Sequence, residues 1–262
     1  MKTKLLSAII LLSGVAVLFN ACKKSESAKP ATVTTATTKQ TAGAQIALNL
    51  YHSLTGQFGG INVYNGISTP SVPNSTSTVK VNSTNYACGF YINNGISYNT
   101  NIGDTIKSST TGGLSFYYVC NNGSAIGYTA QDTLTTVGTA PGYSFIDGLS
   151  QNYKVTGLNP NNSLVTVDGL IQATIVLDRG AKGGKSLTYN SFTLSGLQVH
   201  LDQTPPDITS GKAVFVATGL SGTTAYALYG TLTFLGNHMA KVDYYDSIYY
   251  VNLLTGKIST TI

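Results

Sequence analysis

The residues with the clearest potential for chemistry are a histidine and an aspartate two positions apart, His200 and Asp202. Positions i and i+2 of a strand share one face, so both side chains would lie beside Gln198. A histidine next to a carboxylate could be a base with its orienting partner, or part of a metal site. A third metal ligand, such as His238 or Asp207, could come only from the tertiary fold. The spacing equally fits an ordinary polar strand face, and we predict no metal.

Other enzymatic signatures are weak. The glycine-rich segment 180–186 has one residue too few for a phosphate-binding loop, and a strand pattern follows it instead of a helix. Asp243 with Asp246, or Asp202 with Asp207, could be proposed as glycosidase pairs, but aspartates at turns commonly bind the backbone. The sequence has no Gly-x-Ser-x-Gly elbow. We therefore predict a non-enzymatic chain without a cofactor, with a hydrolase acting on envelope or extracellular polysaccharide as a third hypothesis.

Adjacent tyrosines offer another kind of site. Each of the pairs 117–118, 244–245 and 249–250 would place one ring on either face of a strand. We expect Tyr245 and Tyr250 to be exposed, where an aromatic ring could stack on a sugar or anchor a protein partner. Ordinary half-buried strand positions explain the same pairs, and the absence of tryptophan weakens the sugar-binding version.

The elements that must position these residues are mostly strands. After one helical pattern at 44–54, with apolar residues three and four apart and His52 pointing away from them, the apolar period becomes two. Turn dipeptides separate the predicted strands: Asn94-Gly95, Gly112-Gly113, Asn122-Gly123, Pro141-Gly142, Asp147-Gly148, Asp168-Gly169, Gly183-Gly184, Gly236-Asn237 and Thr255-Gly256. The predicted strands are 61–64, 79–82, 86–92, 115–120, 134–137, 143–146, 153–156, 164–168, 171–178, 187–195, 197–202, 212–218, 225–234, 240–244, 248–253 and 257–260.

This pattern predicts an all-β, mainly antiparallel domain with one short N-terminal helix, built as a β-sandwich or as an open or half barrel. A single domain over 43–262 is within the usual size range for such folds. The clearest part is the C-terminal third, where 225–234, 240–244 and 248–253 should form three successive paired strands.

The net charge of +5 does not indicate nucleic-acid binding. Its excess lies in the first 42 residues, whereas 43–262 has as many basic as acidic side chains. A neutral domain has no basic stripe to neutralise phosphates. We therefore expect no nucleic-acid partner.

The first 22 residues predict where the protein works. Lys2 and Lys4 precede an apolar run at 5–19 that is too short to span a bilayer comfortably, and Ala21-Cys22 follows. This segment resembles the signal peptide of bacterial lipoproteins, although Phe19 and Asn20 depart from the usual lipobox residues. The resemblance implies cleavage after residue 21, acylation of Cys22 with palmitate-type chains, and membrane attachment through that lipid. Lys23 after the cysteine favours the outer membrane.

Residues 22–42 have no periodicity and few large apolar side chains, so we predict that they form a disordered tether. With Cys22 assigned to lipid, Cys88 and Cys120 are an even pair in an oxidising compartment. We predict that they form a disulfide, and the alternative is two buried free thiols.

These expectations describe a cell-envelope lipoprotein that is a non-catalytic binding or structural module. The alternative function is a carrier of an apolar ligand such as a lipid, because a helix ahead of a long antiparallel sheet resembles the half-barrel lipoprotein carriers in element order. The sequence does not identify the ligand, whether glycan, lipid or protein.

Overall fold

The computed structural model describes residues 36–55, 60–63, 66–68, 88–89, 91–102, 105–159, 163–221, 224–245 and 247–261. The predicted signal peptide, Cys22 and the strand predicted at 79–82 lie outside the described residues. No helix within the described ranges is long and apolar enough to cross a membrane.

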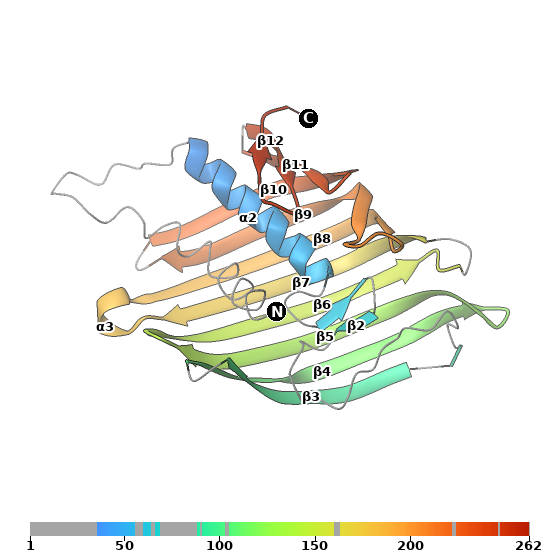
Figure 1. Cartoon of the computed structure of the whole chain (residues 1–262), viewed down its shortest axis with the longest axis horizontal. Helices are drawn as coiled ribbons and strands as arrows, with labels where there is room; N and C mark the ends of the chain where they lie inside the picture. Colours follow the sequence, from blue (N-terminus) through green and yellow to red (C-terminus); the bar gives the residue numbers. More distant parts are fainter. Residues whose placement is uncertain are drawn as a thin grey trace.

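Eleven antiparallel strands form one sheet in which every strand pairs with the next along the chain (Figure 1). They are β3 (Tyr91–Ile102), β4 (Ile106–Asn121), β5 (Ser124–Ala140), β6 (Tyr143–Thr156), β7 (Leu164–Asp178), β8 (Lys185–His200), β9 (Asp207–Ser221), β10 (Thr224–Gly236), β11 (Met239–Tyr244), β12 (Ser247–Asn252) and β13 (Ile258–Ser259). β3 and β13 are the two edges, so the sheet is open and does not close into a barrel. The predicted all-β antiparallel class is confirmed, and so is the C-terminal meander β10-β11-β12.

The strands are longer than the turn dipeptides predict. Asn94-Gly95, Gly112-Gly113, Asp147-Gly148 and Asp168-Gly169 were expected to be turns, but they lie within β3, β4, β6 and β7. Glycine in a long strand allows bending and close approach of neighbouring chains. The pair at 168–169 coincides with a register shift between β7 and β8, which is a bulge. Turns at Asn122-Gly123, Pro141-Gly142 and Gly236-Asn237 do separate strands as predicted.

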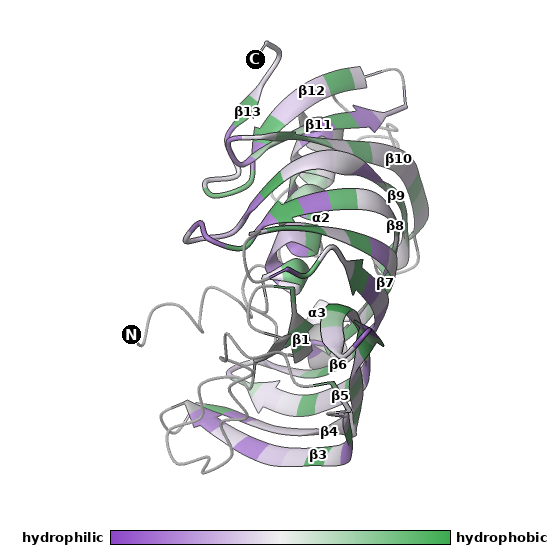
Figure 2. Ribbon diagram, turned by 90° about the vertical axis from the view of Figure 1, so that its right-hand side faces the viewer, coloured by the Kyte–Doolittle hydropathy of each residue, from purple (hydrophilic) through white to green (hydrophobic). Residues whose placement is uncertain are grey.

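A single long helix, α2 (Ala36–Leu54), lies on the hollow side of the curved sheet and crosses its strands obliquely (Figures 1 and 2). It begins eight residues before the predicted start and takes up the end of the predicted tether. Ile46, Leu50 and Tyr51 are fully buried against the sheet. At Gly43 an added Cβ would collide with the Tyr249 hydroxyl, so glycine leaves room for the tip of this ring from β12.

His52 was expected to face solvent, and that expectation was wrong because the side chain is buried. The helix rests in a concavity, so its flanks are covered as well as the stripe that faces the sheet. A second, two-stranded sheet also lies on this side, made of β1 (Gly60–Asn62) and β2 (Gly66–Ser68). The apolar core therefore lies between α2, β1 and the inner face of the large sheet.

The structure joins Cys88 and Cys120 in a disulfide with a Cα–Cα distance of 5.9 Å. This is the pair that the cysteine count predicts. It links the segment before β3 to the end of β4 across 32 residues of sequence, at the edge of the sheet. Strand β3 pairs with a neighbour on one side only, so it has fewer backbone hydrogen bonds than an interior strand. The disulfide therefore restrains this edge of the sheet.

Candidate functional site

A row of polar side chains crosses the inner face of the sheet. The register aligns one residue from each of eight consecutive strands, and most of them bear a hydroxyl. From β3 to β10 they are Tyr98, Thr110, Thr136, Asp147, Ile175, Thr188, Gly219 and Tyr226. We call this the hydroxyl row. It brings together residues up to 128 positions apart without any local sequence motif.

Most of the hydroxyl row is satisfied internally. The Thr110 and Thr136 hydroxyls lie 2.8 Å apart, and Tyr226 donates to the Thr188 hydroxyl at 3.0 Å. At Gly219 an added Cβ would collide with the Tyr226 hydroxyl, so the absence of a side chain lets this ring reach across β9. The hydroxyls of this row therefore bind one another on the inner face of the sheet.

The neighbouring row, two residues along each strand, is made of small and aliphatic residues. Across β4 to β9 it reads Gly112, Leu134, Leu149, Ala173, Asn190 and Ala217. The glycine and the two alanines leave space that larger side chains would fill. The helix above is rigid and cannot move close to all three of their strands at once. A cavity lies at this place.

The cavity has a volume of about 70 Å³ and lies between α2 and strands β3 to β8. Asn49 and Ser53 of α2 form its helix side. The sheet side consists of Tyr98, Leu134, Thr136, Asp147, Gly148, Leu149, Ala173, Asn190 and Phe192. Such a mixture of apolar walls and a few polar groups is typical of small-molecule sites, although pockets for drug-sized ligands are usually several times larger, about 300 Å³ or more.

Two acceptors in this cavity lack donors. The Asn190 side chain is only 2% exposed, and its Oδ1 has no hydrogen-bond partner. Asp147 is partly buried, and burial raises the pKa of its carboxyl from 3.8 to about 7 with no compensating interaction. A buried carbonyl without a donor is costly, and a partly buried carboxylate without one is costly to a smaller degree. The cavity therefore contains oxygen atoms that could accept hydrogen bonds from a ligand, beside an apolar wall.

A second buried acid has a different role. The Asp132 carboxylate accepts hydrogen bonds from the backbone N–H of Ile61 at 2.8 Å and of Gln151 at 3.2 Å. The Gln151 side chain also accepts from Ile61 N–H at 2.9 Å, and Tyr128 donates to the Val63 carbonyl. Burial raises the pKa of Asp132 to about 7 despite these bonds. These residues fasten β1 to the inner face of the sheet.

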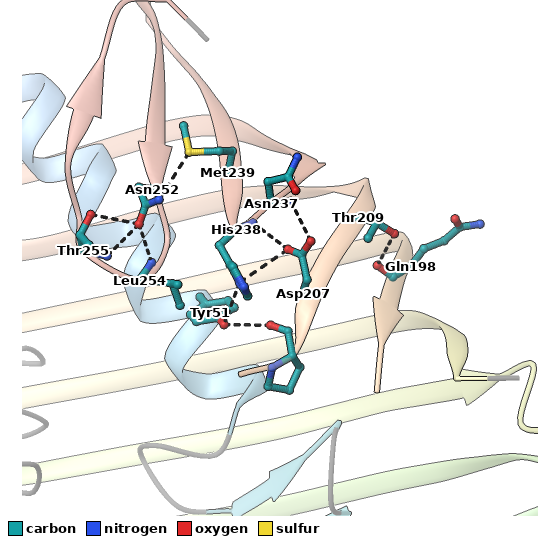
Figure 3. Close-up of polar contacts among 11 residues, drawn as sticks. Tyr51, Gln198, Asp207, Thr209, Asn237, His238, Met239, Asn252, Leu254 and Thr255 are labelled. Atoms are coloured by element: carbon teal, nitrogen blue, oxygen red, sulfur yellow. Dashed lines mark hydrogen bonds and ion pairs between the residues drawn. The ribbon is translucent and has the colours of Figure 1, made fainter. Parts of the chain in front are cut away.

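A polar cluster fastens the C-terminal end of α2 (Figure 3). Buried Asp207, at the start of β9, accepts from the backbone N–H of Asn237 at 2.7 Å and of His238 at 2.8 Å. Those two residues form the β10–β11 turn with φ of 53° each, a conformation that costs free energy without a partner. Tyr51 of α2 donates to the Pro206 carbonyl at 2.9 Å, and its hydroxyl is 3.4 Å from His238 Nδ1. Burial, with the nearby Asp207 charge, raises the pKa of Tyr51 to about 12.

The histidine and aspartate singled out from the sequence lie elsewhere. His200 ends β8, and its Nδ1 is 3.4 Å from Asp202 Oδ1, but Asp202 is 62% exposed. Such an open pair has neither the burial nor a third ligand that a catalytic or metal site needs. Asp207 is not a carboxylate partner for Asp202 in acid–base chemistry, because its oxygens are occupied by the 237–238 turn. Asp246, the proposed partner of Asp243, lies outside the described residues.

Of the two tyrosines proposed for binding, Tyr250 lies on the outer face of β12, and Tyr245 follows the end of β11. Tyr245 is 54% exposed, and its hydroxyl donates to the Ala227 carbonyl at 3.0 Å. Tyr250 is half-buried and sits opposite Lys241 on β11. Tyr249 is buried on the inner face, so the predicted split across the strand is confirmed for 249–250. The Tyr244 and Tyr245 rings lie 4.6 Å apart, so that pair is not split in this way.

The residues that line the cavity were not identified from the sequence. Each is an ordinary strand or helix residue, and only the strand register, which is not a local signal, brings them together. No group of three or more histidine, cysteine, aspartate or glutamate side chains gathers for a metal within the described part of the chain. Comparison with known protein families, with curated proteins and with solved structures finds no match to this chain.

Proposed function

We propose that this protein is an outer-membrane lipoprotein, anchored through acylated Cys22, whose β domain is a non-catalytic module that binds a small molecule in the cavity beneath α2. The observation that carries the binding part is the cavity itself, lined by an apolar wall and by acceptors that the chain leaves without donors. Folded chains rarely keep buried polar groups unpaired unless they serve a function or meet water or a ligand.

The anchor rests on the sequence of residues 1–22 and is tested separately. The full chain, expressed in a diderm bacterium, should fractionate with the outer membrane and incorporate radiolabelled palmitate. Cys22→Ala should abolish the label, whereas Cys120→Ala, which removes a cysteine of the disulfide, should retain it. Equal labelling of wild type and Cys22→Ala would contradict the anchor.

The binding function is tested by native mass spectrometry of the full chain extracted in detergent. A small-molecule adduct at one-to-one stoichiometry is expected, and it should be released on denaturation. A variant on the outer face, Tyr229→Ala, should keep the adduct and serves as a matched control, because Tyr229 is exposed and distant from the cavity lining. A bare chain under conditions that preserve the fold would contradict the proposal.

The second candidate is a carrier of an apolar ligand. It is favoured by the position of α2, which lies across the hollow side of the sheet as a cover. However, Ile46, Leu50 and Tyr51 fill that hollow, so a lipid chain could enter only if α2 moved away. A lipid adduct in native mass spectra of the full chain would support this candidate, whereas a small polar adduct would favour binding in the cavity.

A further inference from the structure

The chemistry of the ligand follows from which groups in the cavity are already satisfied. The hydroxyl row pairs internally, through the Thr110–Thr136 and Tyr226–Thr188 contacts, and it therefore offers little to an incoming polar group. Asn49 accepts from Gln45 at 3.0 Å along the helix. Among the acceptors, one carbonyl oxygen, Asn190 Oδ1, and one carboxylate, Asp147, remain without a donor.

These two acceptors line the same cavity on the inner face. Asn190 pairs with Ala173 in the register, and Asp147 pairs with Ile175, so a single strand, β7, separates them. Two strand spacings and an offset of two residues put their Cα atoms about 12 Å apart, a span that side chains pointing into one cavity can share with a small molecule. On β7, Ala173 beside Asn190 is small, and Ile175 beside Asp147 does not line the cavity.

A ligand that fits must bring donors and a positive charge. A neutral polyol could use the Ser53 hydroxyl and the Asn49 and Asn190 amide groups of the lining, but it would leave the Asp147 charge without a counter-charge. An anion would add a second negative charge beside Asp147. An ammonium group has three donors, no acceptor and a charge that offsets a partly buried carboxylate.

We propose that the cavity beneath α2 is a site for a small primary ammonium compound with a short apolar body, paired with Asp147 and hydrogen-bonded to Asn190 Oδ1. This inference rests on the proposed binding function and names the class of its ligand. Phe192, Leu134 and Leu149 form the wall that the apolar body would contact.

The site should depend on pH. The pKa of Asp147 is about 7, and an ammonium pairs with the ionised form only, so binding should weaken as pH falls below that value. Tyr98 is the other titratable side chain of the lining, and burial raises its pKa, so it stays neutral throughout. On α2, His52 is next to Ser53 of the lining. Burial lowers the pKa of the His52 imidazole, so this ring is less readily protonated as the pH falls.

The test uses three probes of nearly equal size, n-propylammonium, n-propanol and propionate, titrated into the detergent-solubilised full chain by calorimetry. At about pH 8, where Asp147 is ionised, n-propylammonium should bind about tenfold more tightly than n-propanol, as expected for hydrogen bonds to a charged group. Propionate should not bind. At about pH 5.5 the preference for the ammonium should fall several-fold.

Two variants keep the inference falsifiable. Asp147→Asn should erase the preference for n-propylammonium, and Asn190→Leu should weaken its binding at both pH values; circular dichroism melting would confirm that each variant folds. Equal binding of n-propanol and n-propylammonium, or no binding of any probe at tens of millimolar, would overturn the inference. A co-purifying adduct without an amine would overturn it too, while leaving the proposed binding function in place.

Discussion

The two halves of the sheet share one alternation of inward and outward residues but place different side chains on the inner face. From β8 to β12, beneath α2, the inward residues include fully buried Phe192, Phe215 and Leu232. From β3 to β7 they include the hydroxyl row with Asp147, and the buried acid Asp132. We call these the packed half and the polar half. Because the polar half also contains fully buried apolar side chains such as Phe116 and Ile171, the difference lies in the acids and hydroxyls that it adds, of which Asp132 fastens β1.

The largest expected contrast is in the cost of removing a large side chain. Phe215→Ala, in the packed half, should lower the free energy of unfolding by about 3–5 kcal/mol, because this ring is fully buried and packs against Tyr244. Leu149→Ala, in the polar half, should cost about 1 kcal/mol, since this side chain is only partly buried beside an existing cavity. Urea denaturation would measure both free energies of unfolding. Equal losses in the two variants would contradict the distinction between the packed half and the polar half.

The second contrast concerns pH. The folded pKa of Asp132, about 7, is above its unfolded value of 3.8, so between these values the unfolded chain releases the proton that the folded chain keeps. Stability should therefore fall as pH rises from about 4 to about 7, by up to ~1.4 kcal/mol per pH unit, and then level off. Asp147 should add to the slope in the same direction.

Asp132→Asn should flatten this slope, although the amide retains only one acceptor for the two backbone donors of Ile61 and Gln151. Urea melts at several pH values would show it. A slope unchanged in both Asp132→Asn and Asp147→Asn would show that these acids are not the source of the pH dependence.

A smaller effect should come from the hydroxyl row where it enters the packed half. Tyr226→Phe removes the donor to Thr188 and should cost about 1 kcal/mol, the usual net value of one hydrogen bond. The control is Tyr229→Phe, on the opposite face of the same strand, which should cost almost nothing. Equal melting temperatures of the two variants would mean that the row is not held by this bond.

The smallest effect is expected at the pair that the sequence made most prominent. His200→Ala should change the free energy of unfolding by less than about 0.5 kcal/mol, because the Asp202 contact is solvent-exposed. Ligand occupancy of the cavity should be unchanged. A larger loss of stability, or a loss of the ligand, would mean that the end of β8 matters beyond this exposed contact.

Much of the fold could be predicted because it depends on local periodicity. The alternation of apolar residues identified most of the strands, among them β10, whose Leu228, Leu232 and Phe234 are buried. Strand lengths could not be predicted in this way. Asp147-Gly148 has the chemistry of a turn, yet pairing on both sides with β5 and β7 holds it extended, so tertiary context overrides the local preference.

The candidate site could not be predicted, for a related reason. Asp147 and Asn190 have no distinguishing neighbours in the sequence, and the register of three strands brings them into one cavity. His52 shows the same limit for the helix, because a stripe pattern cannot reveal that α2 lies in a concavity. Asp207, noted in the sequence as a potential ligand, binds the 237–238 turn instead.

The central claim is that the cavity beneath α2 holds a ligand, and filling it tests that claim most directly. Ala173→Leu would place a larger side chain between Asp147 and Asn190 without removing any hydrogen bond. Native mass spectrometry of the full chain should then show an adduct on the wild type and a bare mass for the variant, with both chains folded. An adduct of equal occupancy on both, or none on the wild type, would contradict the account.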